Sequence, residues 1–245
     1  CQTKEGKIYK GHDSNKDQSY FLYAVNGEVL RKVLFPIGHL EKSAVRELAK
    51  EYKLETFNKK DSTGICFIGE RKFQSFLSQY LKSQKGAFKR LEDHHVLGEH
   101  PGQCYYTVGQ RKGLGLGGPG GPWFVAKKDA SSNTVFVVEG ENHPALYSNT
   151  LLALDIDWIM DKKEFPLRCT AKIRYRQKDQ ACIIYKEKNG VKVIFDQPQR
   201  AISVGQSIVI YENDLCLGGA VISDIGLTEY EKKLRPSSHS FASLR

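Results

Sequence analysis

The first 72 residues alternate between apolar and polar positions in the patterns of a mixed α/β segment. Residues 7–10 predict a short strand, and a polar loop follows at residues 12–18. From Ala44, apolar side chains recur at spacings of three and four residues, which predicts an amphipathic helix with a face of Val45, Leu48, Ala49 and Tyr52. That face must pack against something, and the chain before it is too short to supply a partner. We therefore expect residues 1–72 to be the C-terminal remnant of a larger α/β domain.

Residues 73–150 are expected to form a small central domain that is mostly β. A helix is predicted after Arg71 and ends before Gly86. Its apolar side chains lie on one side of it: Phe73, Phe76, Leu77, Tyr80 and Leu81. Short apolar runs then predict strands at 86–90, 123–126 and 134–138. A glycine-rich run at residues 109–122 separates the first of these strands from the second.

From residue 151 onward the pattern predicts β-structure almost throughout. Asn189-Gly190, the strongest short hairpin signal, lies between two alternating runs. The expected strand pairs are 181–188 with 191–196, and 208–211 with 215–217. Short strands at regular spacing predict an antiparallel β-barrel over residues 151–228. The polar end, residues 229–245, is expected to be a disordered tail. The predicted fold class is therefore α+β and multidomain.

The charge balance favours a polyanionic partner. Lys and Arg number 37 against 28 Asp and Glu, a formal net charge of +9. Neutralising phosphates releases counterions, so this excess fits a nucleic acid, although an anionic membrane surface would fit too. The sequence has neither an apolar run of roughly 18 residues nor the apolar core of a secretory signal, so we expect a cytoplasmic protein.

Six cysteines occur without a C-x-x-C pair and without the Cys/His spacing of a zinc site. Reduced thiols and the absence of a bound metal are the simplest interpretation. Three of the cysteines lie inside apolar strand patterns and are expected in the core: Cys169, Cys182 and Cys216.

The glycine run contains Gly113-x-Gly115-x-x-Gly118, which matches the dinucleotide-binding fingerprint as a string. That fingerprint requires a helix directly after it, so that the helix N-terminus meets the pyrophosphate. Here Pro119-Gly120-Gly121-Pro122 follows, and we reject nucleotide binding. A basic loop that touches RNA phosphates through Arg111 and Lys112 and a plain surface loop both remain open.

Three cations alternate with apolar residues near the start of the barrel segment, at Lys172, Arg174 and Arg176. Alternation along a strand would place all three on one face. A charged strand face is usually only solvated, but three cations without an acid between them also suit a stripe that follows phosphates.

Two polar turns carry the clearest candidates for chemistry. In residues 15–19, a Lys can meet a phosphate, while the Asp and Gln can read a base edge or hold the loop by turn bonds. In residues 61–71, Cys66 follows a polar turn and a glycine at the start of an apolar run. Such a thiol can be presented to a partner, although composition alone favours a buried cysteine.

Several separate strings together resemble the tRNA-specific 2-thiouridylase family. They are residues 15–22, 34–36, 60–69, 107–115, 122–123, 174–177 and 205–206. The resemblance extends to about Ile225. It implies an N-terminal α/β ATP-pyrophosphatase domain of Rossmann-like type, a small central domain and a C-terminal antiparallel β-barrel that binds tRNA.

The resemblance also implies roles for single residues. Cys66 matches the cysteine that receives sulfur as a persulfide from a donor protein and delivers it to C2 of the wobble uridine, whose oxygen ATP with Mg²⁺ activates. The tRNA contacts implied are Lys16, Asp17, Gln18, Arg174, Tyr175 and Gln206. Strand alternation, however, places Tyr175 on the apolar face of the strand, which makes its RNA contact less secure than that of Arg174. Further candidate contacts are Arg111, Lys112, Lys172 and Arg176.

Two features of the family are absent from this sequence. The ATP loop Ser-Gly-Gly-x-Asp-Ser is missing, and so is the family's first catalytic cysteine, which lies upstream in an Asp-x-x-Cys setting; Cys1 has no such setting. The leading hypothesis is the C-terminal part of a tRNA-uridine 2-sulfurtransferase. The alternatives are a non-catalytic RNA-binding module and a persulfide relay without ATP chemistry.

Overall fold

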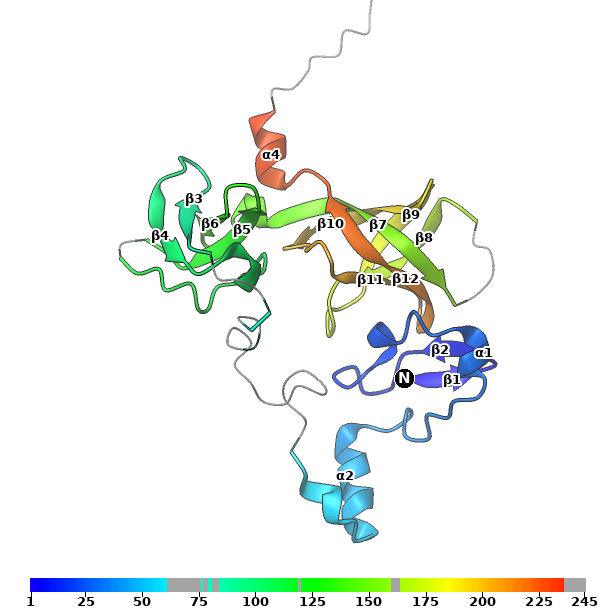
Figure 1. Ribbon diagram of the computed structural model, residues 1–245. Helices are drawn as coiled ribbons and strands as arrows, with labels where there is room; N and C mark the ends of the chain where they lie inside the picture. The colour runs from blue at the N-terminus through cyan, green and yellow to red at the C-terminus, as the bar shows by residue number, and fades with distance from the viewer. Residues whose placement is uncertain (61–75, 77–78, 81–83, 119, 160–163, 236–245) are drawn as a thin grey trace, which may run out of the picture. The chain divides into compact units, whose positions relative to one another are not determined.

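The computed structural model divides into two units (Figure 1). It describes residues 1–60, 76, 79–80, 84–118, 120–159 and 164–235. The first unit combines residues 1–82, 151–197 and 204–224, and the second combines residues 83–150, 198–203 and 225–245.

Six strands of the C-terminal region close into an antiparallel barrel, which confirms the predicted architecture. They are β7 (Tyr147–Trp158), β8 (Leu167–Lys172), β9 (Gln180–Glu187), β10 (Gly190–Arg200), β11 (Ser207–Glu212) and β12 (Leu215–Ile225). The strand order is β12-β11-β8-β9-β10-β7, and β12 also pairs with β7, so no edge is left within the ring. Alternation is clear in β10, where Val191, Val193 and Phe195 are buried.

Two glycines allow barrel strands to approach closely. A Cβ on Gly190 would collide with the carbonyl oxygen of Ala153, and one on Gly218 would collide with that of Asp157. Gly218 also has a positive φ of 147°. The hairpin predicted around Gly190 is confirmed, but Gly190 pairs with Glu187, so the two-residue loop is 188–189, one residue earlier than expected.

The N-terminal segment is attached to the barrel by strand pairing and by a buried cluster. Its elements are β1 (Gln2–Lys4), β2 (Lys7–Tyr9), η1 (Ser19–Phe21) and α1 (Gly27–Leu30). β2 pairs with β12, with Ile8 opposite Cys216. The cluster consists of Ile8, Tyr20, Leu30, Val209, Tyr211 and Cys216. Burial of each large apolar side chain contributes about 1.5–3 kcal/mol, which fixes this segment on the barrel.

Helix α2 (Lys42–Glu51) matches the predicted helix, and η2 (Glu55–Asn58) follows it. None of the α2 residues is buried within the described part of the chain. Leu48 on the apolar face is 40% exposed, and Tyr52 just beyond the helix is 72% exposed. Within the described residues, the apolar face of α2 is therefore half-buried at Val45 and Ala49 and exposed at Leu48.

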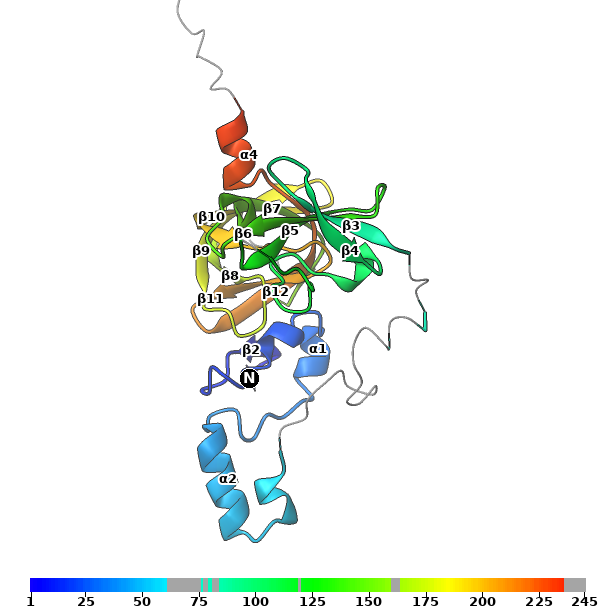
Figure 2. The same cartoon turned by 90° about the vertical axis from the view of Figure 1, so that its left-hand side faces the viewer.

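The second unit is built on a four-stranded sheet (Figure 2). Its strands are β3 (Gly86–Arg90), β4 (Val96–His100), β5 (Trp123–Asp129) and β6 (Thr134–Glu139), in the order β4-β3-β6-β5. β3 runs parallel to β6, and the other pairs are antiparallel. Three strands were predicted and β4 was not. The short helices η3 (Gln103–Tyr105) and η4 (Pro144–Leu146) lie in the connections of this unit.

The predicted disorder of residues 229–245 is wrong for its first part, because Glu229–Leu234 form helix α4. Thr228 and Glu231 make a reciprocal capping box, which satisfies free N–H groups at the helix start. Of the helix predicted after Arg71, Phe76 is helical and Tyr80 lies in a turn, and its other apolar positions lie outside the described residues. No helix in the described ranges is both long and apolar enough to cross a membrane.

Candidate nucleic-acid interface

Asp17 holds together the polar loop that precedes η1. Its side chain is 5% exposed. Oδ1 accepts hydrogen bonds from the backbone N–H groups of Gly11 (2.9 Å) and Ser19 (3.1 Å), and Oδ2 accepts one from the Ser19 hydroxyl (2.7 Å). Charge-assisted bonds of this kind fix a loop in one conformation. The carboxylate is thus turned into the loop, whereas its neighbours are half-buried Lys16 and exposed Gln18.

Ser19 connects this loop to strand β11. Its buried hydroxyl lies 3.1 Å from the phenolic oxygen of Tyr211, which is fully buried. Burial raises the pKa of Tyr211 well above its ordinary value, so the phenol stays neutral. The amino groups of Lys10 and Lys172 lie 4.6 and 5.1 Å from the centre of the Tyr211 ring. The loop is therefore anchored on a rigid part of the barrel.

The predicted stripe of Lys172, Arg174 and Arg176 on one strand face is wrong. β8 ends at Lys172, and the chain then turns, with Arg176 at a positive φ of 63°. The backbone N–H of Ile173 donates to Oε1 of Gln177 at 2.8 Å, which closes the turn. The alternation of a strand therefore stops before Arg174.

Lys172 is engaged inside the unit. Its side chain is 12% exposed, and its amino group lies 3.5 Å from the carboxylate of Asp179, which also pairs with Lys10. The charge of Lys172 is therefore paired with Asp179, and its amino group also lies over the ring of Tyr211. Arg176, by contrast, is exposed.

Gln18 and Tyr175, predicted from two distant segments, are in direct contact. Nε2 of Gln18 donates to the phenolic oxygen of Tyr175 at 2.9 Å. The half-buried Tyr175 ring packs against the buried N-terminal cluster, with its centroid 4.7 Å from that of Phe21 and 6.4 Å from that of Tyr20. Tyr175 thus has the expected apolar surroundings, although it lies in a turn and not on a strand, and its hydroxyl reaches the polar loop.

Tyr20 links the turn at Arg174 to the turn at Gln206. Burial raises the pKa of Tyr20 to about 12, and the positive charge of Arg174 acts in the opposite direction. The Tyr20 ring centroid lies 6.4 Å from that of Tyr175, the next residue after Arg174. The Tyr20 hydroxyl donates to the carbonyl of Ser207 at 2.8 Å, and the Tyr23 hydroxyl lies 3.0 Å from Oγ of the same serine. Gln206, the residue before, is exposed. Three segments that the resemblance implicates in tRNA binding therefore meet around Tyr20.

A cavity of about 270 Å³ lies beside Lys16 and Gln18. Leu34, Phe35 and Pro36 form part of its apolar wall. These three residues belong to one of the strings that carried the family resemblance. The structure thus places residues 34–36 beside the loop of residues 15–19, a proximity that the sequence did not predict.

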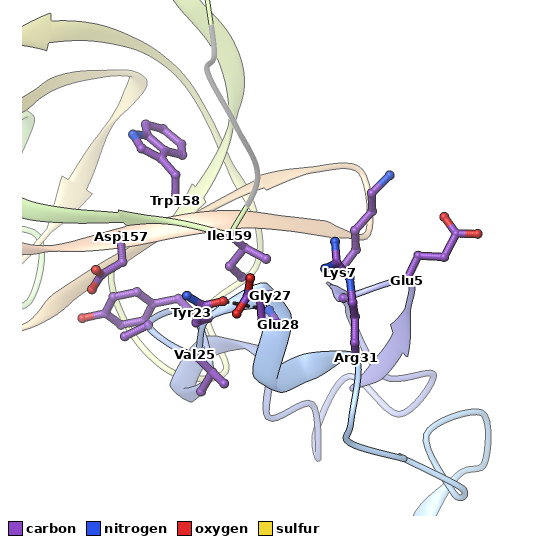
Figure 3. A pocket seen from close by; sticks show the side chains of 13 residues that line it. Glu5, Lys7, Tyr23, Val25, Gly27, Glu28, Arg31, Asp157, Trp158 and Ile159 are labelled. Carbon is purple, nitrogen blue, oxygen red and sulfur yellow. Dashed lines mark hydrogen bonds between the residues drawn. The ribbon is translucent and has the colours of Figure 1, made fainter.

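A second cavity, of about 570 Å³, involves other residues of the first unit. Figure 3 shows Lys7 and Arg31 on one side of it and Tyr23 and Asp157 on the other. Glu28 adds a further carboxylate to its lining. Because both signs of charge line this cavity, it favours no single class of charged ligand.

The glycine-rich loop of the second unit is open and continues into a strand. Arg111 and Lys112 are exposed, and Gln110 braces the loop by donating from Nε2 to the Lys112 carbonyl at 3.0 Å. Gly113 and Gly115 have positive φ, and nothing lies within 4 Å of a Cβ placed on Gly115. The described residues of the loop lead to β5 (Trp123–Asp129), so the element that follows Gly118 is a strand and not the helix that the dinucleotide fingerprint requires.

Cys66 lies outside the described residues, so the structure does not place it. The five cysteines that are described are free. Cys182 and Cys216 are buried, as predicted, whereas Cys169 is half-buried. A hydrogen bond with Cys169, together with burial, raises the pKa of Cys182, and burial raises that of Cys216 to about 12. Both thiols are therefore protonated and poor nucleophiles. In the described part of the chain no His, Cys, Asp and Glu side chains cluster to hold a metal ion.

Three family models match consecutive parts of the chain. They are the tRNA methyl transferase HUP domain at residues 1–70, the tRNA methyl transferase PRC-barrel domain at residues 74–139, and the aminomethyltransferase beta-barrel domain at residues 148–222. The third model covers the closed barrel observed here.

Curated relatives match most of the chain at more than half identity. The tRNA-specific 2-thiouridylase MnmA of Protochlamydia amoebophila is 55% identical over 227 residues, which are 92% of this chain and 60% of the relative. The proteins of the same name from Pseudomonas fluorescens and Francisella tularensis are 53% and 54% identical over 222 residues, 88% of this chain. The chain spans about 60% of the length of these relatives.

Proposed function

This chain belongs to the family of the tRNA-specific 2-thiouridylases, and from this premise we propose that it holds the tRNA and carries the sulfur in a 2-thiolation of the wobble uridine. The observation that carries the proposal is the 2.9 Å hydrogen bond between Gln18 and Tyr175. It joins two segments, far apart in the sequence, through which the resemblance implies tRNA binding. A family relationship alone would not require these segments to form one surface.

We assign the direct tRNA contacts to Lys16, Gln18, Arg174 and Gln206, which lie in the three segments that meet at Tyr20. A cation positions a phosphate, and an amide side chain pairs with a base edge, a sugar or a phosphate. Asp17 acts through its neighbours, because its oxygens are occupied by internal hydrogen bonds.

Of the further candidates, exposed Arg111, Lys112 and Arg176 remain available for RNA, whereas Lys172 is held by Asp179. Tyr175 contributes through the bond from Gln18 and through its aromatic ring.

In this proposal Cys66 is the sulfur carrier. A persulfide donor protein supplies the outer sulfur, which attacks C2 of the uridine while the activated oxygen leaves. A second thiol, which we assign to the part of the relatives that the match does not cover, then attacks the Cys66 sulfur, so that the S–S bond breaks, the outer sulfur stays on C2 and the two cysteines form a disulfide. The buried thiols of Cys182 and Cys216 are unsuited to the task because they remain protonated. The chain lacks the Ser-Gly-Gly-x-Asp-Ser loop, so we assign no contact with ATP or Mg²⁺ to its residues. That activation falls to the part of the relatives that the match does not cover.

We further propose three domains, at residues 1–72, 73–150 and 151–228, in a cytoplasmic enzyme. The family models end at residues 70, 139 and 222, close to these boundaries.

The test is Cys66→Ser in the full-length protein. We expect loss of 2-thiouridine from cellular tRNA, measured by nucleoside mass spectrometry, with tRNA affinity unchanged. Cys104→Ser is the matched control, because Cys104 is the exposed cysteine of the described residues, and it should leave thiolation intact. Retained 2-thiouridine in the Cys66 variant would contradict the proposal.

The two alternative functions predict different results. A non-catalytic RNA-binding module would bind tRNA, but deleting the wild-type gene would leave tRNA 2-thiouridine unchanged. A persulfide relay would carry sulfur on Cys66 without binding tRNA, so a purified full-length protein that accepts persulfide and does not retain tRNA would favour it.

A further inference from the structure

Phe21 is an exposed aromatic residue in an otherwise buried element. In η1, Ser19 and Tyr20 are buried, whereas Phe21 is 56% exposed. Its ring centroid lies 4.7 Å from that of Tyr175 and 5.4 Å from that of Tyr20, and the latter pair is edge-to-face. The ring is therefore held by aromatic neighbours on its inner side while much of its surface faces solvent.

The supports of Phe21 are themselves fixed. Tyr20 is bonded to the carbonyl of Ser207, and Tyr175 accepts a hydrogen bond from Gln18. An exposed aromatic ring held in place loses little conformational entropy when a flat ligand stacks on it.

Positive charge surrounds this aromatic patch. The guanidinium carbon of exposed Arg176 lies 5.2 Å from the centre of the Tyr175 ring. Arg174 is close enough to Tyr20 to act on its pKa, and Lys16 lies two residues before Gln18. The carboxylate in the same loop, Asp17, is buried and saturated with donors. An aromatic ring with cations beside it can bind an unpaired nucleotide, because the ring stacks on the base and the cations attract the phosphates.

We propose that Phe21 is a stacking platform for an unpaired base of the bound tRNA, supported from below by Tyr175 and Tyr20. The inference rests on the proposed function and adds to it a contact that neither the motifs nor the family resemblance assigns. The strength of stacking depends little on which base is present, so Phe21 would hold the RNA strand in place while the amide side chain of Gln18 or Gln206 recognises the edge of a base.

The experiment compares Phe21→Leu with Phe21→Trp in the full-length protein. Leu preserves apolar bulk and removes the π-face, whereas Trp preserves stacking. We expect Phe21→Leu to weaken tRNA binding about 5- to 150-fold with an unchanged salt dependence, because no charge is lost, and Phe21→Trp to bind like the wild type. Tyr185→Ala is the matched control: it removes another exposed aromatic of the same unit, 39% exposed, and should not alter affinity.

A direct probe is a tRNA transcript carrying 2-aminopurine at each unpaired anticodon-loop position in turn. One position should show fluorescence quenching with the wild type and Phe21→Trp, and lose it with Phe21→Leu. Equal affinity and quenching in Phe21→Leu would overturn the platform, and would show that Phe21 is apolar cover for the remainder of the protein. Failure of the wild type to bind tRNA would instead overturn the proposed function.

Discussion

Two polar loops of this molecule both carry basic side chains, yet they are built in opposite ways. The loop of residues 11–21 closes on a buried carboxylate and on the phenol of Tyr211. The loop of residues 109–122 has glycines at positive φ, and Arg111 and Lys112 are exposed. Internal hydrogen bonds fix the first loop before any ligand binds, whereas the glycines of the second leave its backbone more conformational freedom, which a ligand restricts at a cost in entropy. A cation in the first loop should therefore contribute more to tRNA affinity than a cation in the second.

The largest effect should come from removing the carboxylate that fixes the first loop. Asp17→Ala removes the acceptor of the backbone N–H groups of Gly11 and Ser19 in a largely buried site, and leaves the Ser19 hydroxyl with Tyr211 alone. We expect a loss of about 3 kcal/mol in the free energy of unfolding, measured by urea denaturation, together with weaker tRNA binding.

Asp129→Ala is the control for Asp17, because that carboxylate also accepts three hydrogen bonds, from Ser131 and Ser132, but in an exposed turn of the second unit. Those bonds hold the pKa of Asp129 at about 2. Water replaces them readily when the side chain is removed, so its stability loss should be clearly smaller. Equal losses in the two variants would show that burial of the first loop does not set its rigidity.

Arg174→Ala tests whether the turn after β8 contacts phosphate from a prearranged position. We expect about tenfold weaker tRNA binding and a shallower dependence on salt, because one phosphate contact is lost. Arg168→Ala is the matched control: this arginine lies on β8 and pairs with Asp196. An unchanged salt slope in the Arg174 variant would remove this turn from the interface.

Patterns with a local cause were predictable from the sequence. The alternation of β10, the hairpin before it and the spacing of α2 all arise within a few neighbouring residues, and each was confirmed. The capping box of Thr228 and Glu231 was equally local and visible in the sequence. Helix α4 was nevertheless missed, because the end of the chain was interpreted from its polar composition as a disordered tail.

Features that depend on distant partners were not predictable. Alternation beyond Lys172 failed because Gln177 closes a turn on the backbone of Ile173. Gln18 meets Tyr175 across 157 positions of sequence, and no period indicates such a contact. Nothing in the sequence distinguishes Phe21 from the neighbouring Tyr20, and only the structure shows that Tyr20 is buried while Phe21 is exposed.

The smallest effect should come from the glycine-rich loop, where the double variant Arg111→Ala/Lys112→Ala removes two exposed cations. We expect tRNA binding to weaken by about threefold with a measurable change in salt slope and no change in the unfolding midpoint, because neither side chain is buried and much of each contact's gain is spent on ordering the loop. The exposed pair Lys127→Ala/Lys128→Ala on β5 removes the same charge from a rigid strand of the same unit and should leave affinity unchanged. A loss as large as that of Arg174→Ala would mean that the open loop binds as tightly as the prearranged one, and the contrast between the two loops would not hold.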